Sequence, residues 1–373
     1  MTTDTPQGQL EIHVIGAAKG ESIIIRLPNG TWGVIDSYAP SVTHPSTNPT
    51  LQFLRECQVK ELEFLGLTHP HDDHYRGMSH LLNQFSVKYF WRFAAMSPTD
   101  LVNLLKHLNG TAQNAYEIES ASDLETTLDL INQRRKRNML SVKHMSDIKQ
   151  LYPLPVALTA SNRPCDVEIW CIAPSSDHVE RYQNSLRACF TAKGRLKTRP
   201  PALRHNDISG GLLIRYGRTR VVLGGDVEES NWRDTLANLD HAELAAHAVK
   251  VSHHGSATGY TSNLWACFCA DGGQPFAIIP PYRRHRLPKR EAVEHIRQHT
   301  PRIMTTCRPA ISFPTTDDFD IWETYALQVQ LAIRGVFRSF RAGRADELGM
   351  CSLTFDDSGN CLSIKYDGAA SPL

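Results

Sequence analysis

The sequence has 373 residues, which is enough for one large α/β domain or for a domain with an appendage. Lys and Arg number 40 and Asp and Glu number 39, so the formal net charge is +1. This balance argues against a chain that binds nucleic acid through bulk charge alone, although it leaves room for a local basic groove.

The cysteines and the apolar runs bear on the cell compartment. The nine cysteines are odd in number and widely spaced, which predicts reduced thiols in a cytoplasmic protein. No apolar run approaches the length of a membrane span, so we expect no membrane association.

Short β-strands joined by tight turns are predicted at the start of the chain, which favours an antiparallel beginning. The expected strands are residues 10–16, 22–27, 31–36, 62–67 and 87–93. Helices are expected at residues 51–57 and 76–85.

The middle of the chain, from about residue 98 to residue 150, carries apolar residues at helical spacing. We predict that residues 95–160 form a helical insertion beside the active-site edge. Residues 180–205 are polar and basic, with Lys193, Arg195 and Lys197 among them, and are expected to form a loop near the site.

Strands and helices alternate again toward the end. Strands are expected at residues 166–173, 248–252 and 276–280, and a hairpin at residues 211–226. We predict a single domain over residues 1–373 with a C-terminal β-hairpin extension at residues 335–373. This order is typical of an α/β layered protein with mixed sheets.

The stretch GLTHPHDDHYRG follows an apolar run and concentrates candidate metal ligands. A tight loop can direct His69 and His71 to one ion and Asp73 and His74 to a second, with Asp72 facing outward or supporting the ligands from behind. Imidazole and carboxylate ligands suit zinc, manganese or iron. Two close metals can share a hydroxide and lower its pKa. Four potential ligands at this spacing disfavour an accidental polar loop.

The segment T-H-P-H-D-D-H resembles the H-x-H-x-D-H signature of the metallo-β-lactamase superfamily. The resemblance implies a four-layer αββα sandwich with the metals at one edge. Asp226, in VVLGGDVEES, resembles the aspartate that bridges both metals. His253 and His254, in KVSHHGSATG, resemble the last ligand motif, and one of them is expected to bind the second metal; we prefer His254, which directly precedes Gly255.

Two segments, LLIRYGRTRVVLGGDVE and VKVSHHGS, resemble the ComEC-type branch of the superfamily. This branch includes soluble domains of DNA-uptake proteins and stand-alone hydrolases. The opening strands and His285 with Pro288 also follow that branch. The resemblance covers roughly residues 10–90 and 165–310.

Two departures from the branch lie near the N-terminus. Residues 18–21 read AKGE where the branch has G-Q-G-D, and residues 36–38 read DSY where it has D-x-G. Many superfamily members also supply a third histidine to the first metal. Here Asn206 occupies the matching segment, and His205 beside it can substitute, so the first site is expected to be weaker or differently built.

These features predict a hydrolase that uses two divalent metal ions, zinc first and manganese as the alternative. The expected activity is that of a phosphodiesterase or nuclease acting on nucleic acid or nucleotides through a metal-bound hydroxide. The residues expected to act in catalysis are Asp73, Asp226 and His285. The residues expected to bind substrate are Arg283, Arg284, Arg286, Ser256 and Asn206. The residues expected to bind metal are His69, His71, Asp73, His74, Asp226, His253, His254 and His205.

Two other functions are compatible with the sequence. The first is hydrolysis of a small ester or lactone, and it gains ground if residues 283–286 point away from the metals. The second is a metal-stabilised subunit without activity that binds a protein partner through residues 95–160. A complete ligand set argues against the second function.

Overall fold

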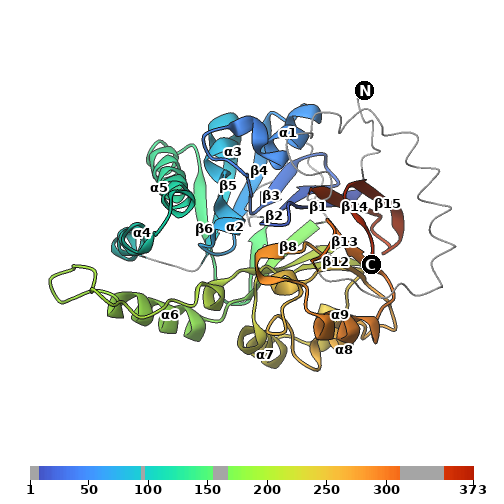
Figure 1. Cartoon of the computed structure of the whole chain (residues 1–373). Helices are drawn as coiled ribbons and strands as arrows, with labels where there is room; N and C mark the ends of the chain where they lie inside the picture. Colours follow the sequence, from blue (N-terminus) through green and yellow to red (C-terminus); the bar gives the residue numbers. More distant parts are fainter. Residues whose placement is uncertain (1–7, 94–96, 154–166, 311–347) are drawn as a thin grey trace.

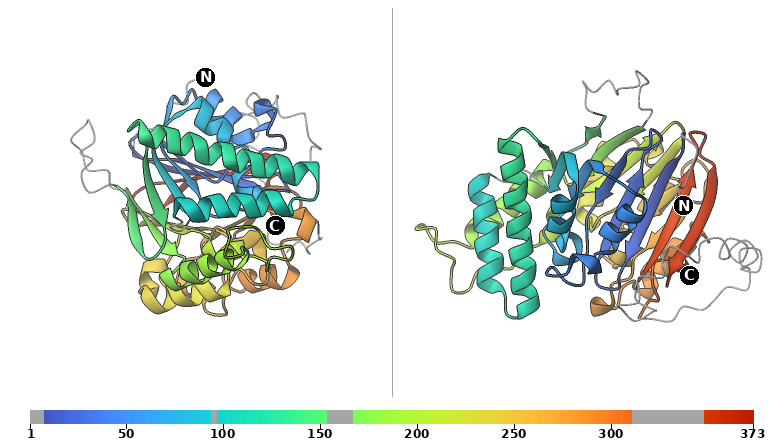
Figure 2. Two further views of the ribbon diagram at one scale, coloured as in Figure 1. Left: turned by 90° about the vertical axis from the view of Figure 1, so that its left-hand side faces the viewer. Right: turned by 90° about the horizontal axis from the view of Figure 1, so that it is seen from above.

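The computed structural model describes residues 8–93, 97–153, 167–310 and 348–373. In these ranges two eight-stranded sheets pack face to face, and helices cover the outer face of each sheet (Figure 1). Figure 2 shows the same layers from two further directions. This arrangement confirms the predicted α/β fold with αββα layers.

The first sheet is antiparallel at its C-terminal hairpin and parallel at the other edge. Its strands from β15 to β3 pair antiparallel, and those from β3 to β6 pair parallel. In spatial order they are β15 (Cys361–Gly368), β14 (Gly349–Phe355), β1 (Leu10–Gly16), β2 (Glu21–Arg26), β3 (Trp32–Ile35), β4 (Glu61–Leu67), β5 (Ser86–Phe93) and β6 (Ser141–Met145).

The second sheet is also mixed, with a parallel centre from β10 to β13. Its strands in spatial order are β16 (Ser371–Pro372), β13 (Ile303–Thr305), β12 (Phe276–Ile279), β11 (Ala248–Lys250), β10 (Thr219–Leu223), β9 (Gly211–Tyr216), β8 (Val167–Ala173) and β7 (Lys149–Tyr152). The expected hairpin at residues 211–226 is β9 and β10.

The helices lie in two outer layers. On the side of the first sheet are α1 (Pro49–Glu56), α2 (Asp72–Tyr75), α3 (Met78–Gln84), α4 (Pro98–Thr111) and α5 (Ala115–Lys136). On the side of the second sheet are α6 (Ser176–Ala188), α7 (Glu229–Asn238), α8 (Leu264–Phe268) and α9 (Arg290–Arg297). Short 3₁₀ helices are η1 (Pro45–Thr47), η2 (His205–Ile208), η3 (His241–Leu244), η4 (Ser252–Gly255) and η5 (Arg283–His285).

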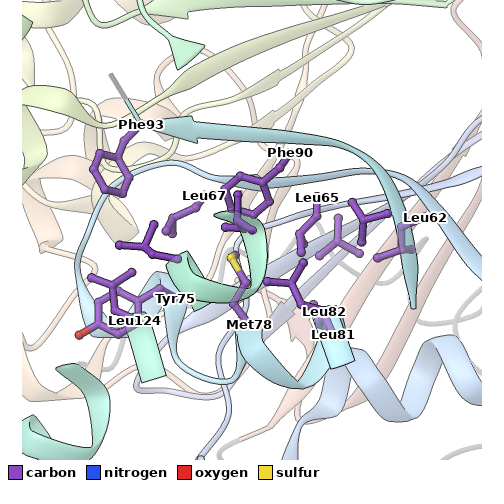
Figure 3. Packing of buried hydrophobic residues seen from close by; sticks show 14 of the residues in the cluster. Leu62, Leu65, Leu67, Tyr75, Met78, Leu81, Leu82, Phe90, Phe93 and Leu124 are labelled. Carbon is purple, nitrogen blue, oxygen red and sulfur yellow. The ribbon is translucent and has the colours of Figure 1, made fainter. Parts of the chain in front are cut away.

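Three buried apolar clusters separate the four layers. The first lies between the first sheet and its helices, where Leu65 and Phe90 meet Met78 (Figure 3). The second fills the space between the sheets and includes Ile214, and the third lies under the helices of the second sheet and includes Trp232. Parallel strands covered on both faces read as nearly continuous apolar runs, and β4 with its sequence ELEFLGL does so.

Residues 95–160, predicted as a helical insertion, contain more than helices. After α4 and α5 the chain forms β6 at the edge of the first sheet and β7 at the edge of the second. Residues 95–96 and 154–160 lie outside the described residues. In the C-terminal range 335–373, strand β14 pairs with β1, so the hairpin is part of the first sheet; residues 335–347 lie outside the described residues.

Two further features concern the cysteines and the helices. The eight cysteines within the described ranges are all free thiols. None of the helices in those ranges combines the length and the apolar composition that a membrane span requires.

Candidate metal centre

The candidate ligands come from segments that follow strands at one edge of the sandwich. The loop after β4 carries His69, His71, Asp73 and His74. The turn after β10 carries Asp226, and η4 after β11 carries the histidine pair of residues 253–254. The two sheets face each other here, so residues distant in sequence meet in one buried cluster.

Asp226 lies between two groups of ligands, and each of its carboxylate oxygens faces one group. Its Oδ2 is 3.8 Å from His69 Nε2, and its Oδ1 is 3.3 Å from His74 Nε2 and 3.8 Å from His254 Nε2. The side chain is buried, with 2% exposure. This is the geometry that a carboxylate needs to bridge two cations.

The first group consists of His69, His71 and Asp226. His69 Nε2 and His71 Nδ1 lie 2.9 Å apart, and the rings are nearly perpendicular. The second group consists of Asp73, His74, Asp226 and His254. In each group one ligand atom per residue lies within 4.8 Å of the others.

Hydrogen bonds fix the tautomers of two ligands through Asp36. The Thr68 hydroxyl donates to Asp36 Oδ2 at 2.7 Å, so it can only accept the contact of 3.0 Å with His69 Nδ1. His74 Nδ1 lies 2.8 Å from Asp36 Oδ2 and donates to it. The lone pairs on Nε2 of His69 and His74 therefore point into the two groups, as metal ligation requires.

His254 is oriented in the same way by the backbone. Its Nδ1 lies 2.9 Å from the carbonyl oxygen of Pro280, which can only accept, so Nδ1 carries the proton. The free Nε2 then faces Asp73 Oδ2 at 3.2 Å. Two lone-pair acceptors at this distance repel unless a cation or a proton lies between them.

The buried atoms without hydrogen-bond partners point to the same conclusion. Among the described residues, His74 Nε2 and Asp226 Oδ1 are buried and lack a hydrogen-bond partner, although a neutral protein interior rarely leaves such atoms unpaired. Both face the second group. The nitrogen and oxygen donors of the two groups thus fit divalent ions such as zinc or manganese.

The pKa directions follow from this crowding. Burial alone would raise the pKa of Asp73, but His74 and His254 outweigh it and lower that pKa to about 2. Burial and neighbouring imidazoles lower the pKa of His69 and His71. The carboxylates of Asp226 and Asp73 outweigh burial at His74 and raise its pKa. The carboxylates are therefore ionised at neutral pH.

The structure places His253 and His254 differently, although the sequence left open which of them binds the second metal. His254 belongs to the second group, whereas His253 Nε2 is 3.9 Å from Asp226 Oδ2, on the side of the first group. Both residues have left-handed backbones, with φ of 47° and 53°, and Gly255 follows at 77°. Such strain is concentrated at functional sites, and here it directs adjacent rings to opposite oxygens of one carboxylate.

Asn206 and His205 occupy different places beside the first group. The Asn206 amide nitrogen lies 3.3 Å from His253 Nε2 and 3.2 Å from Glu228 Oε1. The His205 ring lies edge-on to His71 at 5.0 Å, and its Nδ1 is 2.7 Å from the Tyr182 hydroxyl. His205 is not a member of the compact groups of His, Cys, Asp and Glu side chains found in the described chain.

The three arginines of residues 283–286 do not act as a unit. Arg283 donates to the carbonyl oxygen of Arg308 at 3.0 and 3.1 Å, and Arg286 is exposed with φ of 54°. Arg284 is exposed, and its charge partly offsets burial and Asp73, which together raise the pKa of Asp72 to about 6.

His285 and Ser256 lie at the edge of the metal centre. The His285 ring stacks on Tyr282 at 5.2 Å, and Tyr282 stacks on His254 at 5.3 Å. Burial and Arg284 lower the pKa of His285. The Ser256 hydroxyl contacts Thr258 Oγ1 at 3.2 Å and accepts from the Thr258 amide at 3.3 Å, so it is engaged in its own turn.

Sequence reasoning missed three buried charged residues that support the ligands. Asp36 orients His69 and His74, as described above. Glu21 forms an ion pair with Lys250 and lies 3.3 Å from His254 Nδ1. Lys250, in β11, also donates to the carbonyl oxygen of Gly225 at 2.9 Å. For Glu21 and Asp36 the sequence did contain a signal, because they occupy the acidic positions of the G-Q-G-D and D-x-G motifs.

Two mixed sheets between helical layers, with a His and Asp centre at the sheet edge, define a metallo-β-lactamase fold. No family model matches the chain, and no curated protein is similar to it.

Solved structures give distant likenesses. A mutant of the CmlA β-hydroxylase is 14% identical over 79% of this chain and 51% of its own, with a TM-score of 0.38. The metal-dependent hydrolase Tm1679 of the β-lactamase superfamily is 12% identical over 83% of this chain and 100% of its own, with a TM-score of 0.41. A long-form RNase Z from yeast is 10% identical over 74% of this chain and 36% of its own, with a TM-score of 0.36. The chain therefore spans about half of the hydroxylase, and the differing names leave the activity open.

Proposed function

We propose that the protein is a metal-dependent hydrolase of phosphodiesters, acting on nucleic acid or nucleotides. The observation that carries the proposal is Asp226, whose two oxygens face two separate groups of oriented ligands. When bound there, two divalent ions, zinc or manganese, would polarise a scissile phosphoryl oxygen and lower the pKa of water.

The protein groups have separable tasks in this proposal. Asp226 sets the distance between the two ions. Asp73 is ionised at neutral pH, because its pKa is about 2, and it can accept a proton beside the second group. His285 has a lowered pKa and is largely neutral at pH 7, so it is suited to donate a hydrogen bond to the leaving group.

The preference for phosphodiesters rests on the charge at the rim. Arg284 is exposed and close enough to the metal loop for its charge to act on Asp72, and a guanidinium group can bind a phosphate oxygen pair. Arg283 is held by the backbone of Arg308, so a single arginine of residues 283–286 supports this assignment directly.

Two finer assignments belong to the same proposal. The segment KVSHHGS and the late His285 support a place in the ComEC-type branch of the fold. The exposed faces of α4 and α5, in residues 95–160, are our candidate surface for a protein partner, because α5 holds the metal loop. Arg76 contacts the Tyr116 carbonyl at 3.2 Å, and Asp123 accepts from the Gly77 amide at 2.7 Å.

The test is cleavage of single- and double-stranded DNA and RNA with added zinc or manganese, with wild type beside Asp73→Ala. Bis(p-nitrophenyl) phosphate, an aryl ester and a lactone serve as small substrates. We expect metal-dependent cleavage of phosphodiesters that the variant loses. Cleavage of the ester or lactone alone would establish the small-molecule alternative. Absence of any cleavage, with two metals bound, would favour a partner-binding subunit.

A further inference from the structure

Residues 181–204 form a basic arm that begins and ends beside the metal centre. The segment contains seven basic residues and no acidic one, in a chain whose net charge is +1. It comprises most of α6, a hairpin at residues 189–197 and the segment of residues 198–204 that leads back to η2. In Figures 1 and 2 the loop after α6 reaches out beside α4 and beyond the body of the protein.

The root of the arm touches the first ligand group. Tyr182 on α6 contacts His205 Nδ1 at 2.7 Å, and the His205 ring packs against His71. From Tyr182 the helix continues six residues to Ala188, or about 9 Å, and the hairpin adds about 10 Å more. A polymer that lies along the arm would therefore lead into the metal centre.

The hairpin has a defined structure. Phe190 and Leu196 form a bridge, and both pack against the apolar cluster under the first sheet. Leu196 lies directly over Gly110 of α4, where a Cβ atom would come within 2.5 Å of its Cδ2 atom. Backbone hydrogen bonds between Thr191 and Arg195, at 2.8 Å, and between Lys197 and Cys189, at 2.9 Å, close the turn.

The basic side chains of the hairpin face solvent while its apolar side chains face α4. Lys193, Arg195, Lys197 and Arg199 are exposed, and within the described ranges none of them makes an ion pair. The nearby acidic residues form ion pairs with two other arginines of the arm, Arg187 and Arg204. Asp100 pairs with Arg187 at 3.4 Å, and Glu228 pairs with Arg204 at 2.9 Å.

We propose that this arm binds the phosphate backbone of a polynucleotide and holds it for the metal centre. Four basic side chains without ion-pair partners in the described part of the chain, three on the hairpin and Arg199 directly after it, suit a row of phosphates better than a single small anion. At about 3.4 Å per nucleotide, an arm of about 20 Å spans about six nucleotides. The inference rests on the proposed hydrolase function, and it narrows the substrate from nucleotides in general to polynucleotides.

The test compares a long and a small substrate in one set of variants. The arm variant carries Lys193→Ala, Arg195→Ala, Lys197→Ala and Arg199→Ala. The control variant carries the equal charge change at other exposed positions, through Arg55→Ala, Lys60→Ala, Arg218→Ala and Lys365→Ala. The substrates are a 20-nucleotide single-stranded DNA, a dinucleotide and bis(p-nitrophenyl) phosphate.

We expect the arm variant to lose about tenfold or more in kcat/KM for the 20-mer, through KM, and to keep its rate on the two small substrates within about twofold. The salt slope of 20-mer binding, measured by fluorescence anisotropy, should fall by up to about 3, since each lost single-strand contact contributes about 0.7. The control variant should behave as wild type.

Two results would overturn the inference. One is equal behaviour of arm and control variants on the 20-mer while the small diester is still cleaved, which would leave the hydrolase proposal intact. The other is an equal loss on long and small substrates, which would mean that the arm supports the site and not the polymer. If wild type cleaves nothing, the hydrolase proposal fails, and anisotropy still decides whether the arm binds DNA.

Discussion

Two buried polar clusters, one on the first sheet and one between the edges of both sheets, differ in how their charges are matched. Around Glu11, each carboxylate oxygen has a partner from the protein. Arg26 donates to Oε1 at 2.8 Å, and His13 Nε2 lies 3.3 Å from Oε2. At the metal centre there are four buried carboxylates, of Asp36, Asp73, Asp226 and Glu21, and one buried lysine, Lys250, which pairs with Glu21.

The contrast shows how a ligand site can be told from a structural ion pair. Both carboxylate oxygens of Glu11 contact basic side chains, so this cluster joins β1 and β2. At the metal centre the carboxylates outnumber the one lysine, and imidazole nitrogens are oriented toward them in the same small volume, which suits external cations. Two divalent ions would supply the missing charge.

The largest expected effect is that of metal removal. At ion concentrations 100-fold above each Kd, two bound ions stabilise the fold by about 5 kcal/mol, so a chelator should lower Tm by about 7 °C. Calorimetry of the metal-loaded and chelated protein measures this shift. An unchanged Tm would show that the metal centre resembles the Glu11 cluster in needing no cation.

A smaller effect, on metal affinity, is expected from the substitution Asp36→Asn. Asp36 Oδ1 accepts from the Thr68 amide, and Oδ2 accepts from the Thr68 hydroxyl and from His74. An asparagine must turn its NH2 group toward one of these donors, so it should loosen the ligands that Asp36 orients. Metal affinity should fall about 10- to 100-fold while the fold is retained. Competition with a chromophoric chelator measures the affinity. Wild-type affinity in a folded variant would exclude the positioning role.

At the comparison cluster we expect a loss of stability without a loss of metal. Arg26→Met leaves Glu11 with His13 alone, and the free energy of unfolding should decrease by about 2 kcal/mol. Urea denaturation measures the change, and elemental analysis checks the metal content. Fewer than two ions in the variant would show that the clusters are coupled, against the comparison.

The smallest effect is a pH dependence. Burial would raise the pKa of Glu11, but His13 and Arg26 lower it to about 2 from 4.5. The ionised carboxylate therefore stabilises the fold above pH 4.5, and this contribution is lost as the pH falls toward 2. Solvent screening at this partly exposed pair limits it to about 1 kcal/mol.

The readout is the difference in unfolding free energy between wild type and Glu11→Gln, measured from pH 6 to pH 3. We expect the difference to shrink as the pH falls. A constant difference over this range would show that Glu11 has an ordinary pKa.

The sequence predicted the layers and the densest part of the site because both are local patterns. His69, His71, Asp73 and His74 lie in one loop after an apolar strand, and their spacing alone brings them together. The αββα layers followed from the same motif, through the family it resembles.

Other features depended on contacts that no local pattern contains. The roles of Glu21, Asp36 and Lys250 arise where three strands from distant segments meet. The division of His253 and His254 between the two oxygens of Asp226 depends on two positive φ angles. Within residues 95–160, β6 and β7 are strands of only five and four residues, too short for the periodicity that revealed the helices.

The central claim is that Asp226 joins two separate ion sites, and metal content tests it most directly. Elemental analysis of purified protein should find two divalent ions in wild type, about one each in His71→Ala and Asp73→Ala, and less than one in Asp226→Ala. A wild-type protein without bound metal, or an Asp226→Ala variant with both ions, would contradict the account.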